Sequence, residues 1–318
     1  MVSTGNAISD GQPLPRVAIL GPFGTYSHEA ADRYFGPTAR YNEKLEIKDV
    51  FHALASSSAD FGVVPQENTI FGSVVDTYDA LRAMGRGYIV GEITLRIDHC
   101  LVARTGVRLD EIHTVLSHEQ VRNYVDAIAL ISNQALGQCR LFIAKHLPTA
   151  TTERTTSTAG AARALLDRPH GHAAICSRVC TTLFQGLEVL REAIQADSNN
   201  YTRFYVLARG PDVKLPMNRP RPSESHRTGV IRIIIRQTAA NTSSSTGIQD
   251  ALAMLNTSIS RIDRRPLAGV PFDFVYLVEV QDEQQGQHRS VPEWKQYIET
   301  KVEEVLKAGF SVDLIGAW

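Results

Sequence analysis

The chain has little that would direct it to a membrane or to a nucleic acid. None of its apolar runs approaches the roughly 20 residues that span a bilayer. Its formal net charge is −1 at pH 7, so it has no excess of basic residues for an anionic partner. Residues 1–15 lack the charged start and apolar core of a secretory signal, and we expect a disordered lead-in there. We therefore expect neither a membrane nor a nucleic acid among its partners.

Cysteine is also scarce. The four cysteines are Cys100, Cys139, Cys176 and Cys180, and their spacing matches no zinc-binding pattern. Cys176 and Cys180 are four residues apart on a predicted helix, so they would share one of its faces. We expect all four to be reduced core thiols and the compartment to be the cytoplasm, where disulfides are rare.

Short apolar strands that run into polar turns recur along the first two thirds of the chain. Residues 17–21, 61–65 and 112–116 read as strands, and helical stretches follow them, which is typical of an α/β sheet. Ligands of such sheets bind where the strands end, and the free N–H groups of the helix starts attract anions. The pattern predicts a site for a polyanionic small molecule.

The most informative segment is NNYTRFYVL, residues 199–207. Residues 204–207 read as a buried strand, and Thr202 and Arg203 lie where the preceding loop enters it. A hydroxyl can handle a proton, and Arg can bind a carboxylate through two parallel hydrogen bonds. Taken alone, Thr-Arg-Phe indicates no more than a strand edge, and it gains weight from the three upstream segments.

Four motifs resemble those of one enzyme family. They are GPFGTYSHEAA at 21–31, PQENTIFGSVV at 65–75, IDHCL at 97–101 and NNYTRF at 199–204. Their order and spacing are similar to those of prephenate dehydratase, and residues 228–318 resemble the ACT regulatory domain attached to that enzyme. The resemblance covers about residues 16–318.

The resemblance implies an α/β fold with two parts. The first is a catalytic domain of residues 16–208, with two lobes like those of a periplasmic binding protein and chain crossings near residues 100 and 200. A proline-rich linker, residues 209–227, then leads to a ferredoxin-like βαββαβ ACT domain of residues 228–318. Because ACT domains generally pair between subunits, we expect a homodimer or homotetramer.

The chemistry that the resemblance implies is the conversion of prephenate to phenylpyruvate, water and CO2 in L-phenylalanine biosynthesis. Aromatisation drives this reaction, so no cofactor and no metal is expected. Thr202 is the candidate catalytic residue, as a hydrogen-bond donor or relay to the leaving hydroxyl. Arg203 would hold a substrate carboxylate, and Phe204 would pack behind both.

The same motifs supply the other candidate substrate-binding residues. They are Thr25, Ser27, Glu67, Asn68, Thr69, Gly72, Ser73, His99, Ser117, His118, Ser157 and Thr158. The residues at 25, 27, 157 and 158 can also cap the helices that follow them, and the two histidines can be ordinary core or loop residues. Gly72 and Ser73 are expected to begin a helix. Glu67 can act as a protonated acid or as an ionised group that orients Arg203, and the sequence leaves both interpretations open.

Two features depart from the family pattern. The family's Ser-His-x-Gln-Ala-Leu-x-Gln-Cys segment is split here by residues 121–134, which are either a retained intron in the gene model or a genuine insertion. The effector motifs are also altered, and Arg264 replaces a small residue. Phenylalanine is the candidate effector, and the altered motifs leave open an altered regulator. Its candidate binding residues are Gly247, Ile248, Asp263, Arg265 and Pro266.

Three other functions compete with this interpretation. Arogenate dehydratase acts on a substrate with an amine in place of the ketone, and the sequence does not separate the two. A solute-binding protein shares the two-lobed architecture. A catalytically impaired amino-acid sensor would explain both departures from the family pattern.

Overall fold

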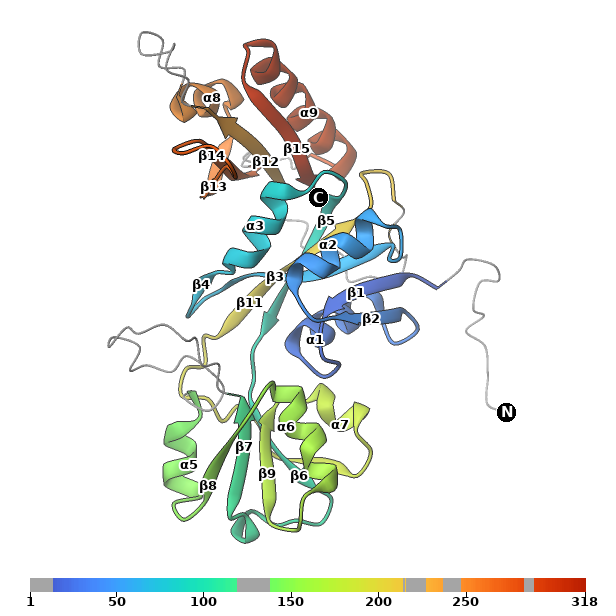
Figure 1. Cartoon of the computed structure of the whole chain (residues 1–318), viewed down its shortest axis with the longest axis vertical. Helices are drawn as coiled ribbons and strands as arrows, with labels where there is room; N and C mark the ends of the chain where they lie inside the picture. The colour runs from blue at the N-terminus through green and yellow to red at the C-terminus, as the bar shows by residue number, and fades with distance from the viewer. Residues whose placement is uncertain (1–13, 119–137, 214, 216–226, 237–246, 283–288) are drawn as a thin grey trace.

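The computed structural model describes residues 14–118, 138–213, 215, 227–236, 247–282 and 289–318. The segment 121–134 and most of the predicted linker lie outside the described residues. The described chain is a mixed α/β fold with two sheets. Figure 1 shows the smaller sheet at one end of the molecule and the C-terminal elements at the other.

The N-terminal elements build one side of the larger sheet. They are β1 (Arg16–Leu20), α1 (Tyr26–Phe35), β2 (Arg40–Lys44), α2 (Ile47–Ala55), β3 (Phe61–Asn68), β4 (Gly72–Ser73), α3 (Val75–Ala83) and β5 (Tyr88–Arg96). β1 pairs in parallel with β2 and β3. The three strand segments expected before residue 120 are confirmed as β1, β3 and β7, with shifted ends.

After β5 the chain crosses to the smaller sheet, whose order is β10-β6-β9-β7-β8. Its elements are β6 (Cys100–Arg104), β7 (Thr114–His118), α5 (Arg140–His146), β8 (Thr151–Thr155), α6 (Thr158–Ala164), β9 (His172–Cys176), α7 (Val179–Leu183) and β10 (Leu187–Arg191), with short 3-10 turns at Leu109–Glu111 and Leu165–Asp167. The chain then returns to the larger sheet as β11 (Tyr201–Ala208). The two crossings thus lie near residues 100 and 200.

β11 lies in the middle of the larger sheet, antiparallel to both β3 and β5. Residues 204–208 are buried, because helices and neighbouring strands cover both faces of this strand. Phe204 is 2% exposed and packs in one of these cores, as expected. The apolar half of β11 therefore anchors the strand, and its first residues lie at the crossing between the two sheets.

The C-terminal module, which we define as described residues 227–318, continues the larger sheet. Its elements are β12 (Thr228–Ile235), α8 (Ile248–Leu255), β13 (Ser258–Pro266), β14 (Phe274–Gln281), α9 (Val291–Lys307) and β15 (Ser311–Ala317). Its strands run in the order β13-β14-β12-β15, and Gly316 of β15 pairs with Ile89 of β5.

The longest of the described helices, α9, shows how the sequence specifies a helix. Ser290 accepts a hydrogen bond from Glu293 N while the Glu293 carboxylate accepts one from Ser290 N, which is a capping box. Pro292 suits the first turn because it needs no N–H partner there. Trp294 and Ile298, one turn apart, bury the face that packs on the module's sheet.

Two local predictions were wrong. Gly72 and Ser73 do not begin a helix; they form β4, a short strand paired with β3, and Gly72 has a φ of 73° that suits glycine. Cys176 and Cys180 do not share a helix face, because Cys176 ends β9 and Cys180 lies in α7. All four cysteines are free thiols and buried, as expected. None of the described helices combines the length and the apolar character that crossing a bilayer requires.

Candidate active site

Asn68 and Thr202 face each other at the end of the β3–β11 pair. They are register partners, and Asn68 Nδ2 donates a hydrogen bond of 2.9 Å to Thr202 Oγ1. Asn68 Oδ1 accepts from the backbone N–H groups of Ile70 and Phe71, which fixes the orientation of the amide. Because Thr202 Oγ1 receives this bond as an acceptor, its own proton can be donated elsewhere.

A series of hydrogen-bonded side chains connects this pair to the smaller sheet. Asn68 Nδ2 also donates to Asn200 Oδ1 at 2.8 Å, and Asn200 Nδ2 donates to Gln138 Oε1 at 2.9 Å. Gln138 lies just before α5, beside the smaller sheet. The pair Asn68–Thr202 is therefore connected to residues from both sides of the chain crossing.

His99 lies at the crossing itself and is the last member of this hydrogen-bonded series on the side of Gln138. Its Nε2 is 3.1 Å from Gln138 Oε1, an acceptor, so that nitrogen carries the ring proton. Its Nδ1 then accepts from the Tyr26 hydroxyl at 2.6 Å. Burial lowers the pKa of His99 to about 4, although Gln138 and Asp98 raise it. The imidazole is thus a neutral link between Tyr26 of α1 and Gln138, and not a proton source near neutral pH.

Thr69 fastens the loop after β3 to the start of β11. Its Oγ1 donates to Asn199 O at 2.7 Å and accepts from Tyr201 N at 2.9 Å. Both capacities of this hydroxyl are therefore used inside the protein. Thr69 holds the two strand ends that carry Asn68 and Thr202.

Arg203 does not lie beside Thr202, which corrects the expected arrangement. Its Nη2 is 2.8 Å from Glu67 Oε2, and its Nη1 is 3.3 Å from Glu92 Oε2 and 3.4 Å from Glu279 Oε1. Successive side chains of a strand point to opposite faces, so the guanidinium lies on the face opposite the Thr202 hydroxyl. The Arg203 guanidinium thus pairs with three carboxylates of the protein itself. Of the two interpretations of Glu67, the geometry matches the one in which it orients Arg203.

The predicted residues before α1 and α6 have capping positions. Thr25 is the N-cap of α1 and accepts from His28 N at 3.4 Å, and Ser27 is buried in the first turn. Ser157 is the N-cap of α6 and accepts from Gly160 N at 2.9 Å, and Thr158 is the first residue of that helix. Thr25 and Ser157 therefore do cap their helices. Other N–H groups of each first turn still have no intrahelical partner.

Ser117 and His118 end β7, next to residues outside the described part. Ser117 is fully buried, and its Oγ has no hydrogen-bond partner among the described residues. His118 Nδ1 lies 3.2 Å from Thr155 O. Ser73, in contrast, lies at the C-terminal module, where its Oγ donates to Asp263 Oδ1 at 3.2 Å.

The candidate effector residues lie on two different faces of the C-terminal module. Gly247 caps α8, whose first residue is Ile248. Arg265 instead binds Asp79 of α3 with two parallel bonds of 2.8 and 2.9 Å, on the opposite face of the sheet. Asp263 also faces this interface, where it pairs with Arg261, and Pro266 O accepts from Arg82. At least three of the five residues thus join the module to the rest of the chain.

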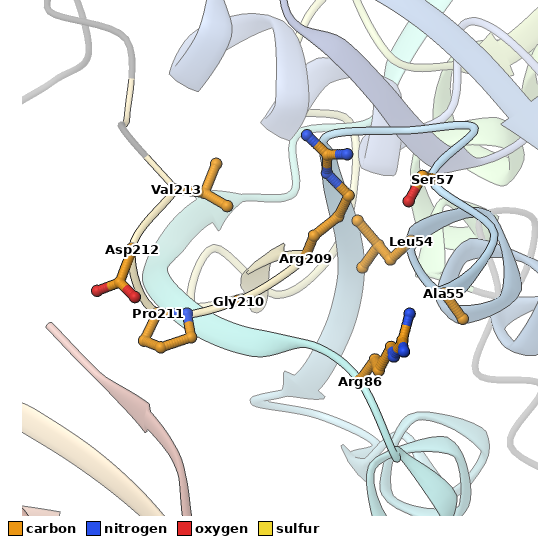
Figure 2. A pocket seen from close by; sticks show the side chains of 9 residues that line it. All are labelled: Leu54, Ala55, Ser57, Arg86, Arg209, Gly210, Pro211, Asp212 and Val213. Carbon is orange, nitrogen blue, oxygen red and sulfur yellow. The ribbon is translucent and has the colours of Figure 1, made fainter.

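Two surface cavities lie away from this cluster. One, of about 380 Å³, is shown in Figure 2, with Asp212 and Val213 on one side and Leu54, Ala55 and Ser57 on the other. Arg209 also lines it, bound to Asp60 Oδ1 at 3.0 Å. Arg209 is seven residues beyond Thr202, which is roughly 23 Å along an extended strand.

The second cavity, of about 410 Å³, lies within the C-terminal module. Its lining is Asn256, Thr257, Ser258, Gln281, Asp282, Arg289, Trp294 and Tyr297. Neither cavity is lined by a residue of the Asn68–Thr202 cluster.

The chain is thus a mixed α/β protein of two sheets, with a hydroxyl–amide cluster where the chain crosses between them. Residues 17–212 match the family model described as "Prephenate dehydratase", and this range is more than half of the chain. The chain belongs to the prephenate dehydratase family. The motifs that carried the resemblance all lie within the matched range.

Named relatives agree with this assignment. The bifunctional chorismate mutase/prephenate dehydratase of Escherichia coli (strain K12) is 32% identical over 84% of this chain and 63% of its own length. Arogenate dehydratase 5, chloroplastic, of Arabidopsis thaliana is 33% identical over 83% of this chain and 58% of its own length. The chain thus spans less than two thirds of the length of these curated relatives.

A solved structure has the same fold along almost the whole chain. It is prephenate dehydratase from Arthrobacter aurescens, in complex with L-Phe. It is 25% identical, with a TM-score of 0.69, and the match covers 95% of this chain and 89% of that one.

Proposed function

We propose that the chain is a prephenate dehydratase, which converts prephenate to phenylpyruvate, water and CO2. The observation that carries the proposal is the 2.9 Å hydrogen bond from Asn68 Nδ2 to Thr202 Oγ1 at the crossing of the two sheets. Membership of the family and the names of the relatives support it.

The proposed reaction needs a hydrogen-bond donor for the hydroxyl that leaves. When one carboxylate departs as CO2, its bonding electron pair enters the ring, and the C–O bond on the far side of the ring breaks. The hydroxyl takes up a proton, which solvent water supplies overall, and leaves as water, and the ring becomes aromatic. Thr202 Oγ1 already accepts a hydrogen bond from Asn68 Nδ2. Its own proton is therefore free to be donated to the leaving oxygen. Such assistance contributes about 10²- to 10⁴-fold to the rate.

The substrate-binding part of the proposal changes with the position of Arg203. Since three protein carboxylates hold its guanidinium, we assign the substrate carboxylates to hydroxyl and N–H groups around the crossing. The proposed substrate-binding residues are Thr25, Ser27, Asn68, His99, Ser117, His118, Ser157 and Thr158.

We also propose a two-lobed catalytic domain of residues 16–208, similar to a periplasmic binding protein, and an ACT domain of residues 228–318. The element order β12-α8-β13-β14-α9-β15 supports the second assignment. Phenylalanine is the proposed effector, supported by the L-Phe complex of the Arthrobacter relative. A homodimer or homotetramer in the cytoplasm completes the proposal.

The test is a prephenate assay of the purified chain and of Thr202→Val, which keeps the shape of the buried side chain but removes its hydroxyl. The wild type should form phenylpyruvate, and the variant should lose about 10²-fold or more in kcat. Thr202→Ser, which keeps a hydroxyl, should retain most of the activity. Equal kcat in the wild type and Thr202→Val would exclude the proposed role of the hydroxyl.

Arogenate dehydratase is the second candidate, supported by the Arabidopsis relative. Parallel assays with both substrates decide which has the higher kcat/KM. Absence of turnover with either substrate would favour the amino-acid sensor, or a block by residues 121–134. Deletion of that segment separates these two outcomes, and the sequence of the spliced transcript shows whether it is an intron.

A further inference from the structure

Glu279 of β14 is a buried carboxylate whose hydrogen-bond partners lie mostly outside its own module. It is 3% exposed. Its oxygens accept from Gln66 Nε2 at 3.0 Å, Tyr205 OH at 3.2 Å and Arg203 Nη1 at 3.4 Å. Only the fourth donor, Ser260 Oγ at 3.0 Å, belongs to the C-terminal module. The carboxylate therefore connects β14 to β3 and β11.

The residues that Glu279 contacts are next to the proposed catalytic pair in the sequence. Gln66 is two residues before Asn68, and Arg203 directly follows Thr202. Glu279 thus holds β3 just before the amide donor and β11 just after the hydroxyl. The Asn68 amide nitrogen donates to Asn200, Tyr201 and Thr202, which all lie outside the C-terminal module, so an effect of Glu279 on this pair is indirect.

A β-bulge gives this contact a consequence for the site. Arg203 is in register with Glu67, but the next residue of β11, Phe204, is in register with Pro65, so Gln66 is the extra residue of β3. A bulge re-aims the side chains that follow it. Here it lets Gln66 and Glu67 both reach the Glu279–Arg203 group, while Asn68 turns to Thr202.

The side chain of the bulged residue is held by one contact in β11 and one in the C-terminal module. Gln66 is fully buried, and its Nε2 donates to Tyr205 OH at 2.6 Å and to Glu279 Oε2. Its Oε1 has no hydrogen-bond partner in the described structure. Loss of the Glu279 acceptor would leave Gln66 Nε2 with Tyr205 OH alone, so one of its two N–H groups would be buried without a partner, which favours a shift of the side chain.

We infer that Glu279 is a positioning residue of the dehydratase site, which fixes the bulge at Gln66 and thereby aims the Asn68 amide at the Thr202 hydroxyl. The inference rests on the proposed function. It assigns to the C-terminal module a part in the basal chemistry, separate from any effector.

The chemistry of the contact predicts what a substitution does. Each Glu279 oxygen faces one nitrogen that can only donate, Gln66 Nε2 or Arg203 Nη1, so Glu279→Gln places an amide nitrogen against one of them without changing the volume. The bulge should shift, and the distance from Asn68 to Thr202 should change with it. A misplacement of about 1 Å in an active site costs on the order of 10²-fold in rate.

The experiment compares kcat and KM for the full chain, Glu279→Gln and Asp282→Asn. Asp282 is the matched control, because it follows β14, is also 3% exposed, and binds Arg289 within the same module. We expect kcat of Glu279→Gln to fall by about 10- to 100-fold with KM within about threefold. Asp282→Asn should keep kcat, and thermal melts should show both variants folded.

A second variant approaches the same contact from β3. Gln66→Leu removes the bulged donor, and its effect on kcat should not add to that of Glu279→Gln, because both act through one bulge. Additive effects would overturn the inference, as would a Glu279→Gln variant with wild-type kcat. Equal losses in Glu279→Gln and Asp282→Asn, in step with their melting temperatures, would also overturn it. Failure of the proposed function is distinguishable, because the wild type itself would then turn over neither substrate.

Discussion

Thr202 and Arg203 are neighbours in β11, yet their side chains lie on opposite faces of the sheet and have no partner in common. The Thr202 hydroxyl accepts a hydrogen bond from the Asn68 amide at the crossing. The Arg203 guanidinium pairs with the carboxylates of Glu67, Glu92 and Glu279. The Thr202-Arg203 pair thus contributes to two different parts of the structure. Its hydroxyl faces the proposed chemistry, and its cation joins the catalytic strands to the C-terminal module.

Asn68→Asp should reduce kcat more than Asn68→Ala does. An Asp carboxylate only accepts hydrogen bonds, so it would take the Thr202 proton that the leaving hydroxyl needs. Asn68→Ala removes the donor but leaves that proton free. We expect kcat to fall by about 10-fold for Asn68→Ala and by about 10²-fold or more for Asn68→Asp, measured with prephenate.

Asn42→Asp, on the exposed strand β2, makes the same chemical change far from the site and should keep wild-type kcat. An Asn68→Asp variant as active as Asn68→Ala would mean that Thr202 does not act by donating its proton.

Arg203→Gln should destabilise the fold, because Glu92 and Glu279 lose the cation that they share, while Glu67 keeps its pair with Arg261. Removing one partner of a largely buried ion cluster costs roughly 3 kcal/mol. Arg178→Gln is the matched control, since Arg178 pairs with Glu192 on the exposed surface and should cost less than about 1 kcal/mol. Urea denaturation of the two variants measures both values. Equal losses would show that the Arg203 cluster is no stronger than a surface pair.

The sequence predicts most elements because their patterns are local. Short apolar runs predicted strands at 17–21, 61–65 and 204–207, against the observed Arg16–Leu20, Phe61–Asn68 and Tyr201–Ala208. The joining of β15 to β5 was not predicted. It depends on Gly316 approaching Ile89 so closely that an added Cβ would lie 2.6 Å from the Ile89 Cβ, and no local pattern reports such a contact.

The site was predicted only in part for a related reason. Asn68 and Thr202 are joined by a hydrogen bond, and His99 is connected to them through Gln138 and Asn200. Gln138 was missed, although it precedes Cys139 in the split family segment, since its role depends on reaching Asn200 across the crossing. Arg203 was misplaced because the tripeptide does not reveal that Glu279, more than seventy residues later, lies on its face.

Glu92→Gln should stabilise the protein at alkaline pH. Burial raises the pKa of Glu92 from 4.5 to about 7, Arg203 lowers it and Glu279 raises it. The folded state therefore keeps a proton that the unfolded state loses, so this contribution is full below pH 4.5 and is lost as pH rises to 7. The loss is about 3 kcal/mol. At pH 8 the variant should be more stable than the wild type, and at pH 4.5 the two should converge.

His99 has the opposite pH dependence. Burial lowers its pKa from 6.5 to about 4, so the folded state resists a proton that the unfolded state binds. Its contribution is full above pH 6.5 and is lost, by about 3 kcal/mol, as pH falls to 4. Between pH 4.5 and 6.5 both Glu92 and His99 change the free energy of unfolding of the wild type. They change it in opposite directions, so their effects partly cancel.

Urea denaturation across this overlap separates the two groups. With Glu92→Gln, the free energy of unfolding should rise more steeply with pH than in the wild type, because His99 is left unopposed. With His99→Gln, which keeps a neutral polar side chain, it should instead fall relative to the wild type, because Glu92 is left unopposed. The double variant should restore a pH dependence close to that of the wild type. Identical pH dependence in both single variants would show that neither group titrates in the folded protein as its burial predicts.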